Sequence, residues 1–252
     1  PSEPSAPCDE EPVPACDTSV MTSSPTEPNE PTADTNANKC PDSTELLARL
    51  LDFADAHNLP WAREVARDLE ALDLAVYGAV AGAATPTLDT AFRGLTKLAD
   101  NSKLWFGIAG VTAVVGGRRG RHAAIDGVIA IGIASFVVNQ PLKRLLPRGR
   151  PDRDHFQVIA GRQVPLPTSP SFPSGHSASA FAFSNAMAGE LAWAALPAHF
   201  LAGAVAYSRV HTGVHYPGDV MVGALLGAGV GDMVGGVRRR RRERQLRLAP
   251  AD

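Results

Sequence analysis

The sequence has few cysteines, and all of them lie near its start. Cys8, Cys16 and Cys40 are the three cysteines of the 252-residue chain, so residues 41–252 contain none. This distribution excludes disulfides within the body of the protein, and it excludes a thiol nucleophile or a cysteine-ligated zinc there. The odd number also leaves at least one thiol unpaired within the chain.

Large apolar side chains are scarce in the first forty residues. Residues 1–41 contain nine prolines, mixed with serine, threonine and glutamate. Such a segment buries too little apolar surface to offset the entropy lost on ordering. We therefore expect a disordered, acidic, proline-rich tail over residues 1–41.

The chain has no overall excess of positive charge, because its 24 Lys and Arg residues are outnumbered by 26 Asp and Glu residues. The charge is divided unevenly, since residues 1–42 hold nine acidic residues and one basic residue. An acidic tail is thus joined to a basic body. The near-neutral total argues against nucleic acid as a partner, because binding to its phosphates relies on a basic surface.

No apolar run clearly exceeds the roughly 20 residues that a helix needs to cross a bilayer. Runs this short also occur in buried core helices. Five runs nevertheless lack a polar stripe and are rich in Gly, Ala, Val and Ile: 104–117, 127–138, 177–189, 191–207 and 220–237. If all five cross, the arginines at 118–121 and 238–247 fall on one side, as the positive-inside rule requires.

These runs predict an all-α, polytopic membrane bundle with about five transmembrane helices. Trp105 and Trp193 are expected in the aromatic belt at the membrane interface. We expect the membrane domain to cover residues 101–237 and a basic cytoplasmic tail to cover residues 238–252. Residues 42–100 have a different pattern, in which leucines and valines recur at helical spacing between charged residues. This region is expected to form amphipathic helices that lie on a protein or lipid surface.

The first polar cluster follows the second run, in the sequence KRLLPRGRP. Lys143 and Arg150 are fixed cations at a turn, and the planar guanidinium of arginine suits phosphate. The alternative is that Lys143 and Arg150 are ordinary anchors at the membrane interface, helped by the neighbouring Arg144, Arg148 and Arg153.

The second cluster, Pro173-Ser174-Gly175-His176, directly precedes an apolar run. A helix that begins here presents free backbone N–H groups to an anion. Gly175 permits close approach of the backbone, Ser174 offers a hydroxyl, and His176 offers a proton. The alternative is a helix cap beside an interfacial histidine.

The third cluster, SRVHTGVHYPGD, contains Arg209, His215 and Asp219. Asp219 can hold one ring nitrogen of His215 and leave the other free as a nucleophile, while Arg209 neutralises an anion. The alternative is a structural hydrogen bond between the two side chains. His211 lies four residues before His215, but the carboxylates of a metal site are missing around it, so a structural role is expected.

In order and spacing, the three clusters resemble the signature of the type 2 phosphatidic acid phosphatase (PAP2) superfamily, which also includes soluble acid phosphatases and vanadium haloperoxidases. Six residues separate Lys143 from Arg150, five separate Arg209 from His215, and three separate His215 from Asp219.

The resemblance implies that His215 forms a phosphohistidine, that Asp219 orients it and that His176 protonates the leaving oxygen. The remaining positions would bind the phosphate oxygens: Lys143, Arg150, Ser174, Gly175 and Arg209. No metal or other cofactor is implied, because fixed cations and a helix N-terminus would stabilise the phosphate charge in place of a metal.

The function expected from the resemblance is metal-independent dephosphorylation of a membrane lipid phosphate, with the lipid phosphate and the bilayer as partners. Candidate substrates are phosphatidic acid, phosphatidylglycerol phosphate and polyprenyl phosphate or diphosphate. We expect a multi-pass protein of the bacterial cytoplasmic membrane with an extracytoplasmic active site. The alternatives are a soluble-type acid phosphatase, a lipid phosphotransferase and a non-catalytic membrane scaffold.

Overall fold

The computed structural model describes residues 45–248, and within that range it consists of helices and loops without a β-strand. The chain divides into a unit of Pro1–Lys39 and a unit of Cys40–Asp252, and every described residue belongs to the second unit. The tail predicted over residues 1–41, with its three cysteines, lies outside the described residues. The prediction of an all-helical fold is confirmed for the rest.

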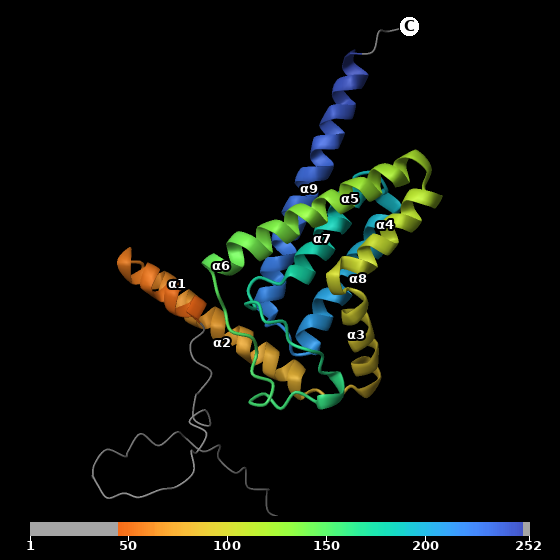
Figure 1. The fold of residues 1–252 in the computed structure, drawn as a ribbon. Coiled ribbons are helices and arrows are strands. Elements are labelled where there is room, and N and C mark those ends of the chain that lie inside the picture. Colours follow the sequence, from red (N-terminus) through yellow and green to blue (C-terminus); the bar gives the residue numbers. More distant parts are fainter. Residues whose placement is uncertain (1–44, 249–252) are drawn as a thin grey trace, which may run out of the picture. The chain divides into compact units, whose positions relative to one another are not determined.

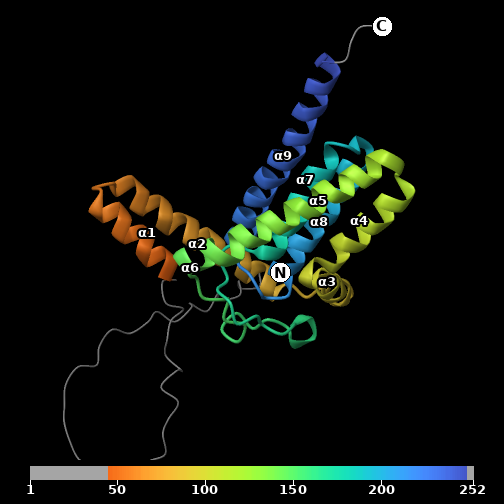
Figure 2. The same ribbon diagram turned by 45° about the horizontal axis from the view of Figure 1, so that its top comes forward.

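Three helices precede the bundle. They are α1 (Glu45–Ala56), α2 (Pro60–Gly82) and α3 (Pro86–Leu98), and α2 and α3 meet at an angle of 114°. Pro60 and Pro86 each begin a helix, where the missing N–H of proline costs nothing. Figures 1 and 2 show α1 and the first half of α2 standing clear of the bundle.

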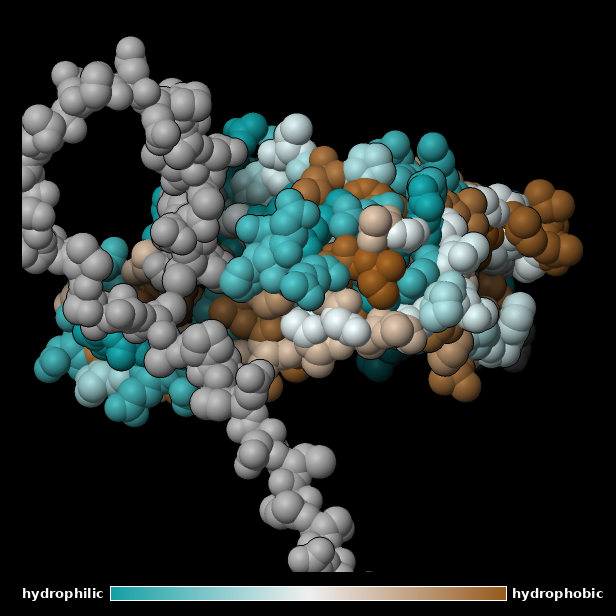
Figure 3. Space-filling view, turned by 90° about the horizontal axis from the view of Figure 1, so that it is seen from below, coloured by the Kyte–Doolittle hydropathy of each residue, from teal (hydrophilic) through white to brown (hydrophobic). Residues whose placement is uncertain are grey.

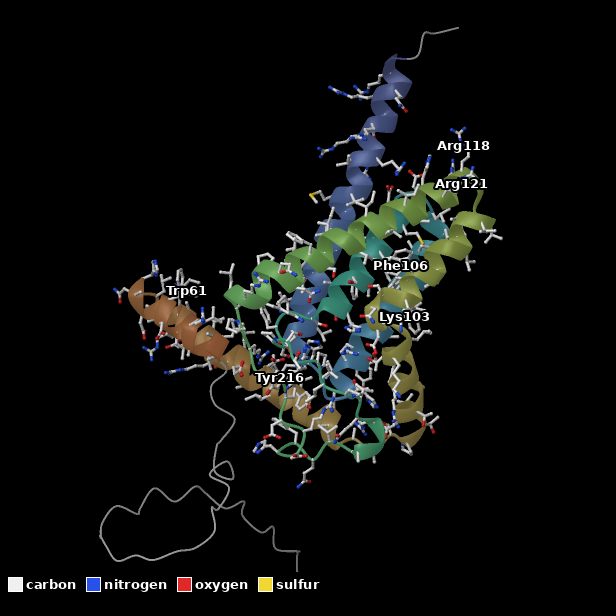
Figure 4. All side chains as sticks on the ribbon, viewed as in Figure 1. Trp61, Lys103, Phe106, Arg118, Arg121 and Tyr216 are labelled. Carbon is white, nitrogen blue, oxygen red and sulfur yellow. The ribbon has the colours of Figure 1, made fainter. Side chains whose placement is uncertain are left out.

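Helix α2 is amphipathic, but it is not its apolar face that packs against the bundle. Its apolar residues Leu69 and Leu72 are each 60 % exposed, whereas the polar Asp73 and the neighbouring Tyr77 are buried. The face that packs against the bundle is therefore partly polar and charged. The face left open is the apolar one, on which the labelled Trp61 lies far from the bundle (Figure 4).

Five further helices form the bundle, and each includes most or all of one predicted apolar run. They are α4 (Lys103–Val115), α5 (Gly117–Val137), α7 (Gly175–Ala188), α8 (Ala192–His211) and α9 (Pro217–Leu248). Helix α5 continues through a widened turn, η2 (Val138–Leu142), into the short α6 (Lys143–Leu145). Helix α7 lies at the centre and packs against α5, α8 and α9 (Figures 1 and 2).

Two segments are long and apolar enough to cross a membrane, namely Gly117–Leu145 and Pro217–Gln245. The bent pair α2 and α3 would add a third if it counted as one span. All five predicted runs thus form helices, but five crossings remain a prediction. The shorter α4, α7 and α8 fall below the usual length or apolarity of a span.

A row of glycines lets α9 approach the backbone of α7. At three positions on α9 an added Cβ would collide with a carbonyl oxygen of α7 or of its cap: Gly223 with Ser174, Gly227 with Ala178 and Gly231 with Ala182. Glycines four residues apart lie on one face of a helix, and small residues there allow close helix packing. This contact fixes the start of α7 beside the start of α9.

Some boundaries differ from the expectation. The arginines at 118–121 lie in the first turns of α5 rather than in a loop, because the helix already begins at Gly117. Helix α9 continues to Leu248 through the basic segment. Trp105, which we expected at the membrane interface, is instead buried against Phe183 at a ring distance of 5.4 Å, because it lies on the inner face of α4.

Candidate active site

A cavity of about 420 Å³ lies at the end of the bundle where α7 begins and α8 ends. Its lining includes six of the eight predicted site residues: Lys143, Arg150, Gly175, His176, Arg209 and His215. Segments far apart in the sequence therefore converge on one space. Figure 3 looks at this end of the molecule and shows hydrophilic surface beside hydrophobic patches.

His215 lies just before α9, and Asp219 lies in the first turn of that helix. The Nδ1 atom of His215 is 3.3 Å from Oδ2 of Asp219 and 3.2 Å from Oγ of Ser171. Ser171 also donates a short hydrogen bond to the same carboxylate oxygen, as does the backbone N–H of Tyr216 at 3.0 Å. The carboxylate is thus fixed from three sides.

This arrangement leaves Nε2 of His215 available to a ligand. No described residue forms a hydrogen bond with Nε2, and the ring lines the cavity although the residue is only 2 % exposed. Burial lowers the pKa of His215 to about 3, against the hydrogen bond and charge of Asp219, which raise it. His215 is therefore a neutral imidazole at physiological pH, as a nitrogen nucleophile must be.

Two of the cations are held by neutral groups. Lys143 donates to Oγ of Ser169 at 3.2 Å, and Arg150 donates to backbone carbonyls, including that of Val214 at 2.9 Å. Burial lowers the pKa of Arg150 to about 10, which still leaves it charged at neutral pH. Because their partners carry no charge, Lys143 and Arg150 keep their positive charge for an anion in the cavity.

A carboxylate that the sequence analysis did not predict also lines the cavity. Asp100 belongs to a short 3₁₀ turn, η1 (Asp100–Ser102), in which Asn101 and Ser102 have positive φ angles of 53° and 59°. Its Oδ1 is 3.0 Å from Nε2 of His176 and 3.8 Å from Nη1 of Arg209.

The hydrogen bond from His176 lowers the pKa of Asp100, and the nearby Arg209 acts in the same direction. Asp100 is therefore an anion held between two of the predicted phosphate-site residues. Arg209 is further fixed by a 2.6 Å hydrogen bond to Thr96 on α3. Asp100 thus contacts two of the residues that the resemblance assigns to the active site.

Arg148, which the anchoring alternative placed at the membrane interface, instead lies inside the protein. Its side chain is buried, and it pairs with Asp219 at 2.9 Å, Asp73 at 2.7 Å and Glu70 at 2.9 Å. Burial alone would lower the pKa of Arg148, but the three carboxylates outweigh it and raise the pKa. Asp73 also accepts a hydrogen bond from the N–H of Gly218, so α2 is tied to the start of α9.

Ser174 and Asp219 lie behind the cavity rather than on its lining. Ser174 is the N-cap of α7, where its Oγ accepts a hydrogen bond from the N–H of Ser177 at 3.4 Å. Its backbone N–H donates to the carbonyl of Asp219 at 3.0 Å. His211 is buried and lies 2.8 Å from Asp89, a contact outside the cavity that agrees with the structural role expected of it.

A small cavity lined by two histidines and three cations, at one end of a bundle with helices long enough to span a membrane, fits a membrane phosphatase. Residues 123–241 match the PAP2 superfamily. The chain belongs to this superfamily and is a PAP2-type phosphatase.

The chain is similar in sequence to several named phosphatases. The chain is 38 % identical over 155 residues to the decaprenylphosphoryl-5-phosphoribose phosphatase of Mycobacterium tuberculosis, covering 60 % of this chain and 83 % of that protein. The phosphatase of the same name from Mycolicibacterium smegmatis is 31 % identical over 62 % of this chain and 82 % of its own length. The lipid A 1-phosphatase of Rhizobium johnstonii is 38 % identical over 34 % of this chain and 36 % of its own.

Two solved structures share the fold. The transmembrane PAP2-type phosphatidylglycerolphosphate phosphatase from Bacillus subtilis has a TM-score of 0.55 at 24 % identity, covering 77 % of this chain and 94 % of that one. Aquifex aeolicus LpxE has a TM-score of 0.50 at 26 % identity, covering 65 % of this chain and 94 % of that one.

Proposed function

We propose that this protein hydrolyses the phosphomonoester of a membrane lipid through a phosphohistidine on His215, without a metal cofactor. The observation that carries the proposal is the free Nε2 of His215, which lines a cavity beside Lys143, Arg150 and Arg209. A neutral imidazole next to fixed cations suits nucleophilic attack on a phosphate dianion.

In the first step, Nε2 of His215 bonds to phosphorus as the bond from phosphorus to the lipid oxygen breaks. The leaving oxygen takes the proton from Nε2 of His176. Asp219 offsets the positive charge that develops on the ring of His215, from which it is 3.3 Å away. The cations and the N–H groups at the start of α7 bind the other phosphate oxygens, whose charge they stabilise.

In the second step, the oxygen of a water molecule attacks phosphorus and the bond between phosphorus and Nε2 breaks. His176 accepts a proton from that water, so His215 and His176 return to their starting states and inorganic phosphate leaves. A hydroxyl group of a second lipid or sugar in place of water would give a phosphotransferase.

Asp100 prepares His176 for the first step in this proposal. The carboxylate keeps a proton on Nε2 of His176, 3.0 Å away, while the cavity is empty of substrate. When the substrate enters, its leaving oxygen replaces Asp100 as the acceptor of that proton. Asp100 then turns outward, which its partial exposure of 47 % permits.

The substrate class that we favour is a phosphate carried on a polyprenyl-linked sugar. The support is the similarity to decaprenylphosphoryl-5-phosphoribose phosphatases, of which this chain covers more than four fifths. An apolar groove of about 360 Å³ also runs along α4 from Leu98, which lies two residues before Asp100. A lipid tail in that groove would place the headgroup in the cavity.

The proposed location is the bacterial cytoplasmic membrane, with the cavity on the extracytoplasmic side. The support is the clustering of arginine at the other end of the bundle, on the first turns of α5 and the last turns of α9. Such clusters favour the cytoplasmic side of the membrane.

The test measures phosphate release by the full-length protein in detergent with EDTA present. The substrates are decaprenylphosphoryl-5-phosphoribose, phosphatidylglycerol phosphate, phosphatidic acid and the water-soluble p-nitrophenyl phosphate. We expect release from the lipids, fastest from the polyprenyl compound, with His215→Ala inactive and the exposed-loop control His155→Ala active. Full activity of His215→Ala, or activity that EDTA abolishes, would contradict the mechanism.

A further inference from the structure

A second polar cavity lies at the end of the bundle opposite the active site. It has a volume of about 520 Å³ and is lined by Arg118 and Arg119 on α5, Glu190 in the turn before α8, and Arg238 and Arg241 on α9. Figure 4 shows Arg118 at the far end of the molecule from Tyr216, the residue that follows His215. Two helices, α5 and α9, thus bring arginines to one space.

The positive charge of this basic pocket is only partly neutralised. Arg238 forms a two-point ion pair with the buried Asp126, and Glu190 supplies one further negative charge. Among residues 45–248, Arg118, Arg119 and Arg241 have no carboxylate at ion-pair distance. Two positive charges are therefore left over, and the three arginines together can bind a phosphate group.

An apolar groove begins where the basic pocket ends. It has a volume of about 330 Å³ and lies between α5 and α9, along Ile129, Ile133, Met233 and Val237. Arg238 and Arg241 line both cavities, so the two are neighbours on the same part of α9. Met233 is 56 % exposed and Val237 is 49 % exposed, which leaves apolar surface open for a chain of methylene groups.

We propose that the basic pocket and the apolar groove form one binding site for an anionic phospholipid. The headgroup phosphate lies among Arg118, Arg119 and Arg241, and an acyl chain lies in the groove between α5 and α9. A soluble anion would use the arginines but not the groove, and a neutral lipid would use the groove but not the arginines. Basic pockets between membrane helices are suited to acidic lipid headgroups.

The bound lipid would join α5 to α9 at the end where α9 projects beyond the bundle (Figure 1). In the protein alone, the ion pair between Asp126 and Arg238 makes that connection. The site is separate from the catalytic cavity, so its occupancy does not depend on the reaction proposed above. We expect the lipid to raise thermal stability without being consumed.

The experiment uses full-length protein in a neutral detergent and measures lipid adducts by native mass spectrometry, together with Tm. The probes are dioleoylphosphatidylglycerol, dioleoylphosphatidylcholine and glycerophosphoglycerol, which is the headgroup without acyl chains. We expect phosphatidylglycerol alone to be retained and to raise Tm. The double variant Arg118→Gln/Arg241→Gln should weaken its binding by about tenfold, because each arginine near a lipid headgroup contributes a several-fold increase in affinity.

The matched control is Arg239→Gln/Arg240→Gln, which also removes two positive charges, both from α9, at positions that line neither cavity. It should bind phosphatidylglycerol within about twofold of the wild type. Both variants should keep wild-type phosphatase activity, which shows that they fold. If the first double variant does not fold, Arg241→Gln alone, on the exposed part of α9, replaces it.

Three results would overturn the proposal. Equal retention of phosphatidylcholine would show that charge is not recognised. Equal binding of glycerophosphoglycerol would show an anion site without a place for the acyl chain. Equal losses in the two double variants would show diffuse attraction to the basic helix rather than a site.

Discussion

Asp100 is the residue whose position is hardest to reconcile with a simple phosphate site, because it brings a negative charge among the cations. It lies 3.0 Å from His176 and 3.8 Å from Arg209. Two residues with positive φ follow it and turn the chain so that the carboxylate faces inward. In our proposal Asp100 lowers affinity for phosphate and in return keeps His176 protonated.

Asp100→Asn separates these two effects, because the amide oxygen can still accept the hydrogen bond from His176 while the charge is gone. We expect inorganic phosphate or vanadate to inhibit about fivefold more strongly, the equivalent of about 1 kcal/mol for a partly exposed ion pair. We expect kcat to fall. The alkaline limb of the pH profile should move to lower pH, because the protonated imidazole loses its countercharge.

Inhibition constants and pH profiles of the wild type and Asp100→Asn are the measurements. Unchanged inhibition, together with an unchanged alkaline limb, would show that Asp100 has no part in the site. A lower kcat with an unchanged inhibition constant and an unchanged alkaline limb would indicate a purely structural role.

The buried imidazole of His215 makes stability depend on pH. Its pKa is about 3 in the folded protein and about 6.5 when exposed, so the unfolded state binds more protons between these values. The free energy of unfolding should therefore decrease as the pH falls from 6.5 towards 3. His215→Asn should show a shallower decrease of Tm over pH 6.5–4, and parallel curves for the two proteins would contradict this account.

The sequence was sufficient to group the candidate site residues that occur in short clusters. His215 and Asp219 are four apart, and Ser174, Gly175 and His176 are adjacent, so local geometry already relates them. Asp100 could not be predicted in this way, because its role depends on a turn remote in sequence from His176. The ion pairs of Arg148 could not be predicted either, because nothing local distinguishes it from Arg150, two residues later.

At the scale of helices, the contact of α7 with α9 depends on the absence of side chains. A Cβ at position 227 would collide with the carbonyl oxygen of Ala178, whereas a Cβ at position 229 meets nothing within 4 Å. Both glycines belong to the same helix, so they form a matched pair for mutation.

Gly227→Ala should lower the free energy of unfolding by about 1–3 kcal/mol, the usual cost of overpacking. Gly229→Ala should leave it unchanged or raise it by up to about 1 kcal/mol, because alanine favours the helix. Unfolding in detergent, followed by circular dichroism, measures both. Equal effects of the two substitutions would show that the close packing of α7 and α9 is not what holds the helices together.

The helices of the bundle were predictable because their apolar runs are continuous, but their ends and orientations were not. Helix α9 continues to Leu248 because arginine favours helix, so the change in composition near residue 238 does not mark an end. Trp105 was expected at the interface from its type, whereas its burial follows from which face of α4 meets α7. Such facing depends on tertiary packing.

At the scale of the whole molecule, α2 couples the N-terminal helices to the site. Arg148 links Glu70 and Asp73 of α2 to Asp219, and Asp73 also binds the backbone at Gly218. Ion pairs between residues 71 to 78 positions apart cannot be inferred from a single sequence. What the sequence could predict was that three clusters share one site, and six of the eight residues do line one cavity.

The central claim is that His215 carries the phosphoryl group during turnover. The direct measurement is rapid acid-free denaturation of the protein during turnover of a ³²P-labelled lipid phosphate, followed by peptide mapping. We predict an acid-labile, base-stable label on the peptide that contains His215, absent from His215→Ala and much reduced in Asp219→Asn. A turning-over enzyme without a label on that peptide, or with the label on another residue, would contradict the account.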